Sequence, residues 1–353
     1  MRFFHLINVR WYNATAWYAL NLCRLLQANG FDTIAGVLPN TETARKAKEM
    51  GIKTYEDDFT TNSPFKIFAL TRRINRFLRE FKPDFITAHR GEIFWLFALK
   101  RYFSKPAWRL IRVRGDERKP KDNFANRFLH NVCADRVIVS CDLLKREFVN
   151  RLQTPEDQID VIYGGVDTRK FAFDRSGRDR ARSEFGFNKN DIVIGFVGRY
   201  SEVKGHKTLI EAARSLRQSD PRYKLLFVTD SADLDIADLQ TMIDENGLTN
   251  HAFITGFRSD IVACISAFDV GVVASIGSEA ICRVAFEIMS VGVPLIASNV
   301  GATPEIAPSG NITPPSDPRT LAEKIKNHDK NVRVFSDEAF LAAYLAACDK
   351  ARI

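Results

Sequence analysis

Residues 270–299 read VGVVASIGSEAICRVAFEIMSVGVPLIASN, and this stretch carries the pattern that decides the fold. Two short apolar runs, 270–275 and 294–299, are typical of buried strands, and the apolar segment between them predicts a helix. Glu279 stands in front of that helix, and Glu287 lies inside it, flanked by large apolar residues. A carboxylate in such surroundings is expensive to bury unless it is paired. The plain alternative is an amphipathic helix with one solvated glutamate, so the rest of the sequence has to decide.

The same alternation of short apolar strand, loop and helix runs along the whole chain. It predicts parallel sheets with helices on both faces, because parallel strands need crossover connections. The pattern restarts near residue 191, after a charged segment without a sustained apolar period. Strands are expected at residues 2–8, 32–39, 84–89, 108–115, 135–140, 192–198, 224–230, 251–256, 270–275 and 294–299, and helices at 15–30, 66–81 and 337–351.

We therefore predict an α/β protein of two doubly wound, Rossmann-like domains. Ligands of such sheets bind at the carboxyl ends of the strands, and we expect a cleft between the domains. The first domain is expected over residues 1–172, completed by the C-terminal helix 337–353, and the second over residues 173–336. A chain of 353 residues is also too long for one ordinary core.

Composition excludes several classes of protein. With 45 % hydrophobic and 27 % charged residues the chain is expected to fold rather than to be disordered. No apolar stretch reaches the roughly 18 residues of a membrane span, and the N-terminus lacks the pattern of a signal peptide. The six cysteines are scattered, which predicts reduced thiols in the cytoplasm, and no grouping of Cys, His and acidic residues predicts a metal site.

A second informative stretch is GFVGRYSEVKGHKTLIEA, residues 195–212. A strand ends at Gly198, a polar loop follows, and a helix begins near Gly205. Arg199 and Lys204 stand at the two ends of the loop, and two cations beside a helix N-terminus suit a diphosphate. The loop matches neither GxxxxGK[ST] nor GxGxxG. An ordinary strand-to-helix connection with solvated charges is the alternative.

Three blocks in order resemble a known family. They are DRVIVS…DVIYGGVDTRKF (135–171), GFVGRYSEVKG (195–205) and the segment FITG…TPEI (253–306), which holds Glu279 and Glu287 with seven residues between them. The chain resembles the retaining glycosyltransferases of family four with the GT-B fold, of the type that builds bacterial cell-surface glycans. The resemblance covers the second domain almost throughout and the first domain loosely.

The resemblance implies a role for each matched residue. Glu287 would accept hydrogen bonds from the ribose hydroxyls of a nucleotide-sugar, for which a carboxylate has the right acceptors. Glu279 would face the transferred sugar, and Arg199 and Lys204 would hold the diphosphate and stabilise its charge as it leaves. Arg258 is expected near the base. The segment after Glu279 would lie against the donor, and it consists of Ala280, Ile281, Cys282 and Arg283.

The resemblance also bears on donor and cofactor. It implies a metal-independent enzyme without a cofactor, whose donor is a UDP-sugar first, with GDP- and ADP-sugars as alternatives. The family often has glycine where this chain has Ala280 and Cys282, so the donor does not transfer from the family. In the first domain, His89 at a strand end would contact the donor sugar, although a structural role for such a histidine is nearly as well supported.

Charge is divided unevenly between the two parts of the chain. Residues 1–187 carry a net charge of +12 and residues 188–353 a net charge of −4. A basic first domain suggests an anionic acceptor, such as a phosphorylated or lipid-linked glycan of the lipopolysaccharide type. The residues expected to contact the acceptor are Arg10, Arg114, Arg118, Lys119 and Lys121.

Helix 66–82 is basic on one side and apolar on the other, which could place it on the anionic surface of the inner membrane. An ordinary sheet-covering helix with a solvated face is the alternative. The basic stretch matches no nucleic-acid-binding motif, so a nucleic-acid partner is not expected. Two other functions stay open: a catalytically weak nucleotide-sugar-binding protein, and a nucleotide-sugar epimerase of the same fold.

Overall fold

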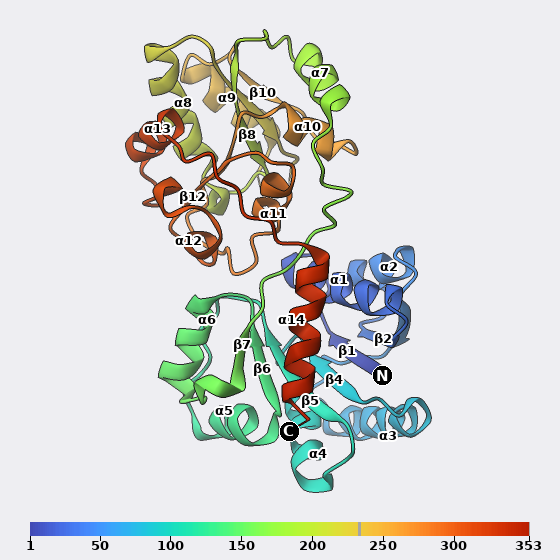
Figure 1. The fold of residues 1–353 in the computed structure, drawn as a ribbon. Coiled ribbons are helices and arrows are strands. Elements are labelled where there is room, and N and C mark those ends of the chain that lie inside the picture. Colours follow the sequence, from blue (N-terminus) through green and yellow to red (C-terminus); the bar gives the residue numbers. More distant parts are fainter. Residues whose placement is uncertain (232–233, 353) are drawn as a thin grey trace. The chain divides into compact units, whose positions relative to one another are not determined.

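The computed structural model describes residues 1–231 and 234–352, and the chain divides into two compact units. The first unit is Met1–Gly164 with Asp337–Ile353, and the second is Gly165–Ser336. Ile353, the last residue of the predicted C-terminal helix, lies outside the described residues. Each unit has its own parallel sheet, as the alternation of strands and helices predicts (Figure 1).

The first unit contains a seven-stranded sheet in the order β3-β2-β1-β4-β5-β6-β7. Its central strands are continuous apolar runs because helices cover both faces of the sheet. The strands are β1 (Arg2–Ile7), β2 (Asp32–Val37), β3 (Lys53–Glu56), β4 (Phe85–Ala88), β5 (Arg109–Arg114), β6 (Arg136–Val139) and β7 (Ile159–Val161). The helices are α1 (Ala14–Ala28), α2 (Glu42–Glu49), α3 (Pro64–Phe81), α4 (Phe94–Ser104), α5 (Phe124–Phe128), α6 (Asp142–Glu147) and α14 (Asp337–Lys350).

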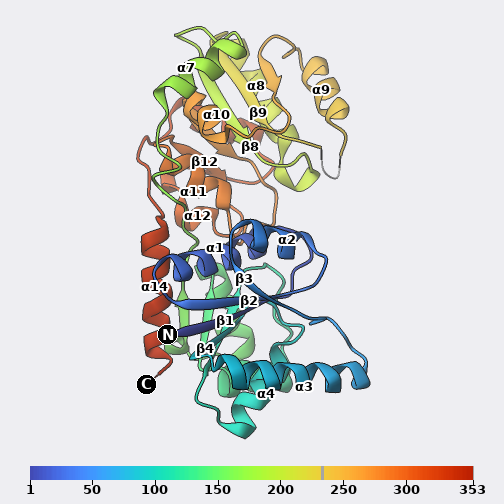
Figure 2. The same ribbon diagram turned by 90° about the vertical axis from the view of Figure 1, so that its right-hand side faces the viewer.

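Two groups of buried side chains pack on opposite faces of this sheet. Leu70 and Ile74 of α3 and Phe97 of α4 pack with Phe4 on one face. Residues of α1 and α2 pack with Ile7 on the other. Because side chains alternate along a strand, neighbours in β1 enter different cores. Figure 2 shows the sheet between α3 and α4 on one side and α1 and α2 on the other.

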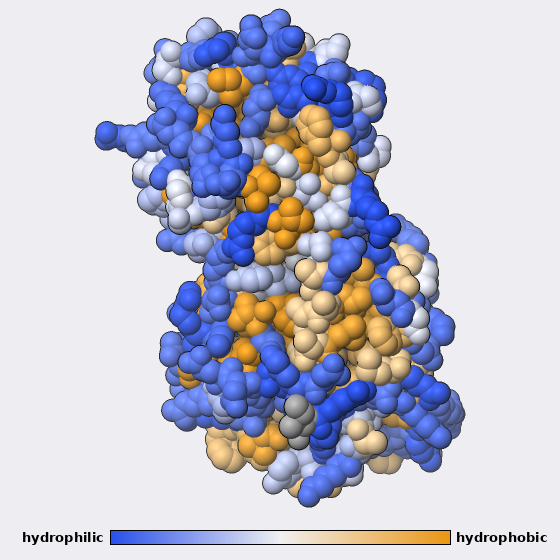
Figure 3. Space-filling view, viewed as in Figure 1, coloured by the Kyte–Doolittle hydropathy of each residue, from blue (hydrophilic) through white to orange (hydrophobic). Residues whose placement is uncertain are grey.

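The C-terminal helix α14 belongs to the first unit. The hydroxyls of Tyr344 and Thr87 in β4 lie 2.6 Å apart, and Asp337 forms a 2.5 Å salt bridge with Arg24 of α1. The outward face of α14 carries exposed alanines, and Figure 3 shows moderately hydrophobic residues over it. Residues at the far end of the sequence therefore complete the first core.

The second unit contains a six-stranded sheet in the order β10-β9-β8-β11-β12-β13. The strands are β8 (Ile192–Val197), β9 (Tyr223–Val228), β10 (Ala252–Ile254), β11 (Val270–Val273), β12 (Leu295–Ser298) and β13 (Ile312–Thr313). The helices are α7 (Arg175–Glu184), α8 (His206–Ser219), α9 (Ile236–Glu245), α10 (Ile261–Ala267), α11 (Arg283–Ser290), α12 (Thr303–Ile306) and α13 (Pro318–Lys326).

The change of unit comes earlier than the predicted boundary at residue 172. The amide of Val166 donates to the carbonyl of Phe335, and Ser290 of α11 donates to the carbonyl of Phe171. These bonds attach the segment after β7 to the second unit, which moves the boundary to Gly164. The charged segment before residue 191, which has no sustained apolar period, also contains a helix, α7, whose surface is almost wholly polar.

Candidate functional site

Two loops of the second unit meet at the carboxyl ends of β8 and β11. The amide of Ile276, after β11, donates to the carbonyl of Val203 in the loop after β8, at 2.8 Å. Gly205 has a φ of +72°, and a Cβ on it would overlap the carbonyl oxygen of Ala274. Only glycine allows this approach, because it has no Cβ and adopts positive φ freely. The two loops that carry Lys204 and Glu279 are therefore held together by backbone.

Glu279 lies at the centre of this junction. It is 3 % exposed, and its Oε1 lies 2.6 Å from Nζ of Lys204 and 2.5 Å from Oγ of Ser275. Burial, and after it the Glu279 carboxylate, raises the pKa of the neighbouring Cys282 thiol well above its ordinary value. The buried Glu279 carboxylate needs Lys204 and Ser275 as partners, because an isolated buried charge would lose its hydration without compensation. The sequence placed both residues in the site, but it gave no sign that they pair with each other.

Glu287 is also buried and paired, but in a different way. It lies in α11, is 5 % exposed, and accepts a 2.6 Å salt bridge from Nε of Arg283 one helical turn earlier. Burial raises the pKa of the Glu287 carboxyl, and Arg283 offsets part of that rise. A carboxyl whose pKa is raised by burial, on a helix beside the loop junction, is typical of functional sites.

Ala280 and Cys282, at positions where the family often has glycine, adopt ordinary backbone conformations. Ala280 and Cys282 are 5 % and 1 % exposed, and Ile281 is 7 % exposed. None of the three has a positive φ, whereas Ser278 just before them has a φ of +64°. Alanine and cysteine therefore fit here without strain, and their side chains are packed inside the unit.

The other two cations predicted for the site, Arg199 and Arg258, lie in different surroundings. Arg199 is exposed and takes part in no salt bridge among residues 1–231 and 234–352. Arg258 binds Glu184 of α7 through two hydrogen bonds of 2.6 and 2.9 Å, and it also pairs with Asp260 at 2.8 Å. Its guanidinium thus joins the loop after β10 to α7, and its place near a base stays a prediction.

His89 is the site prediction that the structure changes most. A contact with the donor sugar and a structural role are the two expectations; His89 is 2 % exposed and its Nε2 lies 3.0 Å from Nδ1 of His5, which favours the structural role. Burial lowers the pKa of His5 to about 3. Burial, then His5 and Arg112, lower the pKa of His89 well below its usual range. Both rings are therefore neutral at pH 7. The partner, in β1 84 residues away, left no signal in the sequence.

The expected acceptor residues lie in loops at the carboxyl edge of the first sheet. Arg114, at the end of β5, pairs with Asp116 at 3.0 Å and donates to the carbonyl of Arg118. Lys119 and Lys121 are exposed in the same loop. Arg10 lies in the loop after β1, whereas the other four residues lie at the end of β5 or in the segment that follows it.

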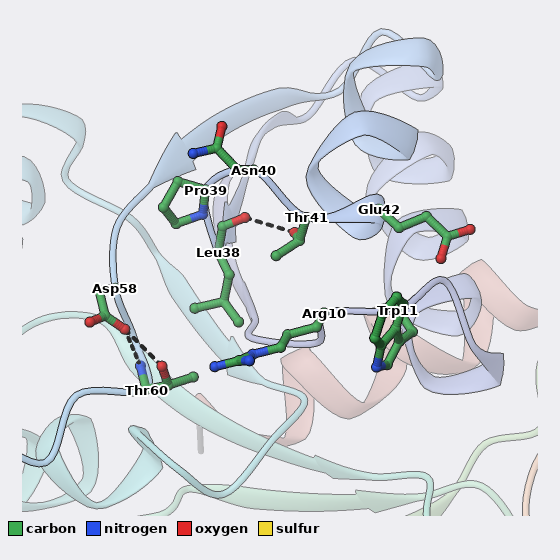
Figure 4. A pocket seen from close by; sticks show the side chains of 9 residues that line it. All are labelled: Arg10, Trp11, Leu38, Pro39, Asn40, Thr41, Glu42, Asp58 and Thr60. Atoms are coloured by element: carbon green, nitrogen blue, oxygen red, sulfur yellow. Dashed lines mark hydrogen bonds between the residues drawn. The ribbon is translucent and has the colours of Figure 1, made fainter.

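Arg10 lines a pocket of about 400 Å³ at the carboxyl ends of β1 and β2 (Figure 4). Trp11 stands at its rim with 73 % of its surface exposed, and Asp58 and Thr60 lie across from it. Figure 4 shows the Arg10 side chain extending toward Thr60. An exposed indole ring beside charged and hydroxyl groups provides an apolar face and polar partners, which suits a polyhydroxylated ligand.

Two further observations concern the described residues as a whole. Within them, no three His, Cys, Asp or Glu side chains are grouped so that they could hold a metal ion. Nor does any of their helices combine the length and the apolar character needed to cross a membrane.

Comparison with family models gives matches in both units. Residues 177–331 match the model of glycosyl transferases group 1, and residues 15–170 match that of glycosyltransferase family 4. Together these matches cover most of the chain.

Curated relatives are similar over part of their length. The chain is 26 % identical to spore coat protein SA of Bacillus subtilis, over 56 % of each protein. It is 29 % identical to D-inositol 3-phosphate glycosyltransferase of Mycolicibacterium smegmatis, over 50 % of this chain and 40 % of that protein. The chain thus spans about half the length of these relatives.

Solved structures share the fold over nearly the whole chain. HepE of Anabaena in complex with UDP has a TM-score of 0.80 at 21 % identity and covers 99 % of this chain and 95 % of its own. The lipopolysaccharide outer core galactosyltransferase WaaB has a TM-score of 0.73 at 14 % identity, with 98 % and 99 % covered.

Proposed function

Since the chain belongs to the family-four glycosyltransferases with the GT-B fold, we propose that it transfers a sugar from a nucleotide-sugar to an acceptor. The observation that carries this proposal is the junction of Lys204 and Glu279, with Glu287 on the following helix. It places a cation and two carboxylates at the carboxyl ends of parallel strands, where ligands of such sheets bind.

The roles follow from the charges of these groups. The diphosphate of a bound donor would compete with Glu279 for Lys204, and exposed Arg199 would supply a second cation. Negative charge grows on the diphosphate as the sugar leaves, so both cations stabilise the transition state more than the ground state. Glu279 is thereby left facing the sugar, and Glu287 accepts hydrogen bonds from the ribose in place of Arg283.

Several finer points belong to the same proposal. We expect a UDP-sugar as donor, since HepE is solved with UDP and with UDP-glucose. We expect transfer with retention of anomeric configuration, without a metal, in the cytoplasm; NMR of the product anomer tests retention. Lys204 and Arg199 would do electrostatically what a divalent cation does in other transferases.

An anionic acceptor is the second part of the proposal. The first unit is strongly basic, and Arg118, Lys119 and Lys121 are exposed at the carboxyl edge of its sheet. One relative is named for D-inositol 3-phosphate, and a structural neighbour for the lipopolysaccharide outer core. A phosphorylated or lipid-linked glycan fits this charge, and acceptor KM should then rise with salt.

The first prediction concerns nucleotide binding. We expect wild-type protein to bind one of UDP, GDP and ADP in calorimetry, and Glu287→Ala to lose most of that affinity because the ribose loses its acceptor. Glu323→Ala, an exposed glutamate in α13, is the matched control and should bind normally. Failure of the wild type to bind any of the three nucleotides or their sugars would refute the proposal.

A further inference from the structure

The outward face of α3 combines aromatic and basic residues in one line. Phe65, Phe68, Arg72, Arg76 and Arg79 recur at spacings of three and four residues, so they share one side of the helix. The two phenylalanines are 88 % and 67 % exposed. The apolar residues that hold α3 on the sheet lie on its opposite side and are Leu70, Ile74 and Leu78.

The arginines of this face line a broad groove of about 1100 Å³. Its other walls come from the segments that precede β4 and β5, with Lys82, Lys100 and the nearly buried Trp108. These segments lie at the amino ends of the strands. The groove is therefore at the opposite edge of the first sheet from His89 and Arg114, and it is separate from the expected acceptor residues.

Six cations line the groove, and among the described residues five of them form no salt bridge. Within the described residues, neither the three arginines of the line nor Lys82 and Lys100 form a salt bridge. The neighbouring Arg73, by contrast, binds both oxygens of Asp57 at 2.7 and 2.8 Å. Asp84, the acid that lines the groove, accepts the backbone amide of Arg2. A concave surface lined by six cations and one further carboxylate, Asp84, keeps an excess of positive charge and attracts a multiply charged anionic partner.

Further exposed aromatic residues lie at the end of α4, which packs on the same face of the sheet as α3 (Figures 1 and 2). Phe103 is 74 % exposed, and it contacts Tyr102, which is 42 % exposed. Exposed phenyl rings cost free energy in water, but they are stabilised in the interfacial layer of a membrane.

We propose that α3 and this groove form a docking surface for an anionic lipid membrane. The arginines and lysines would bind lipid phosphates, to which guanidinium groups donate in pairs. Phe65 and Phe68 would enter the interfacial layer. Nucleic acid is a weaker fit, because the exposed rings are paired at one end of the helix rather than interleaved with the cations. This surface would dock the protein on the membrane that contains a lipid-linked acceptor. In this respect the inference rests on the proposed function.

The test is flotation of the full chain with vesicles of phosphatidylcholine alone, or mixed with phosphatidylglycerol. Wild type should bind the mixed vesicles, less so with added salt, and should not bind the neutral ones. The triple variant Arg72→Ala, Arg76→Ala, Arg79→Ala should bind roughly 100-fold more weakly, at about one factor of five per cation. Phe65→Ser with Phe68→Ser should also weaken binding, at unchanged charge.

The matched control removes three exposed cations of the second unit, by Arg175→Ala, Lys189→Ala and Arg214→Ala. It should bind vesicles like wild type, and equal loss in both triple variants would overturn the proposal. So would absence of wild-type binding, or binding of a single-stranded oligonucleotide instead of vesicles. All variants should still bind the nucleotide, which separates failure here from failure of the proposed transfer.

Discussion

At the scale of residues, Glu279 and Glu287 show two ways of keeping a carboxylate buried. Glu279 pairs with Lys204 across two loops, 75 residues apart in the chain. Glu287 pairs within its own helix, with Arg283 at the i−4 position. A bound donor would attract Lys204 away from Glu279 and would displace Arg283 from Glu287. The ion pairs that stabilise the free protein are thus the groups that would recognise the ligand.

Lys204 allows these two roles to be separated. Lys204→Ala should lower the transfer rate roughly 100- to 1,000-fold, because a charge-stabilising contact is lost. It should also lower the free energy of unfolding by about 1–3 kcal/mol, because Glu279 stays buried without its cation. Adding Glu279→Gln should restore stability in urea unfolding but not activity.

Lys207→Ala, an exposed lysine in the first turn of α8, is the control for this series. It should leave both rate and stability near wild type. If Lys204→Ala were stable and fully active, the ion pair would have neither role.

At the scale of elements, the site depends on where α8 begins. The helix starts at His206, directly after Gly205, whose positive φ turns the chain against the end of β11. Sequence reasoning placed the start near Gly205 because glycine commonly punctuates helix ends. It did not show that this turn packs against the backbone carbonyl of Ala274. That contact fixes the distance between the two loops, and with it the approach of Lys204 to Glu279.

Gly205→Ala should therefore destabilise the protein by roughly 2–5 kcal/mol, from a strained φ and a steric overlap together. Gly256→Ala is the matched control, because Gly256 has a φ of +69° but a Cβ added to it would meet no atom within 4 Å. It should cost only about 1–2 kcal/mol. Equal losses in the two variants, measured by urea unfolding, would show that the contact with Ala274 is unimportant.

At the scale of the whole molecule, buried histidines are present in both units. His5, His89 and His130 lie in the first and His206 in the second, each at most 7 % exposed. Burial lowers the pKa of His5 and of His130 to about 3, and that of His206 to about 4. The unfolded chain binds protons at these sites near pH 6.5, so it is favoured by acid.

Stability from these histidines should be fully present above about pH 6.5 and be lost progressively toward about pH 3. His206→Phe should reduce this loss, because His206 already packs among the rings of Phe196 and Phe227. His328→Gln, at a half-buried surface position, is the control. Urea midpoints measured across this pH range would contradict the argument if His206→Phe and wild type lost stability in parallel.

The sequence by itself was enough for the fold class and for most of the elements. Apolar runs such as RFFHLI and LIAS are buried on both sides, so hydrophobicity alone locates them. Some of the missed elements are those whose burial is slight. β3 and β7 are short edge strands, and α7 buries only Gly177, Ala181 and Arg182, so neither kind has an apolar period.

The candidate site divides in the same way. Lys204 was singled out by its place in a strand-to-helix loop, and Glu279 and Glu287 by their place around an apolar helix together with the resemblance to the family. Arg283, the partner of Glu287, is local, four residues earlier in the same helix, but the pairing of Lys204 with Glu279 and the burial of His89 against His5 were decided by tertiary structure alone. A strand-end pattern says that a side chain lies at the edge of a sheet, but whether it is buried depends on residues brought from elsewhere in the chain. Local sequence carries periodicity, whereas pairing and burial are properties of the packed whole.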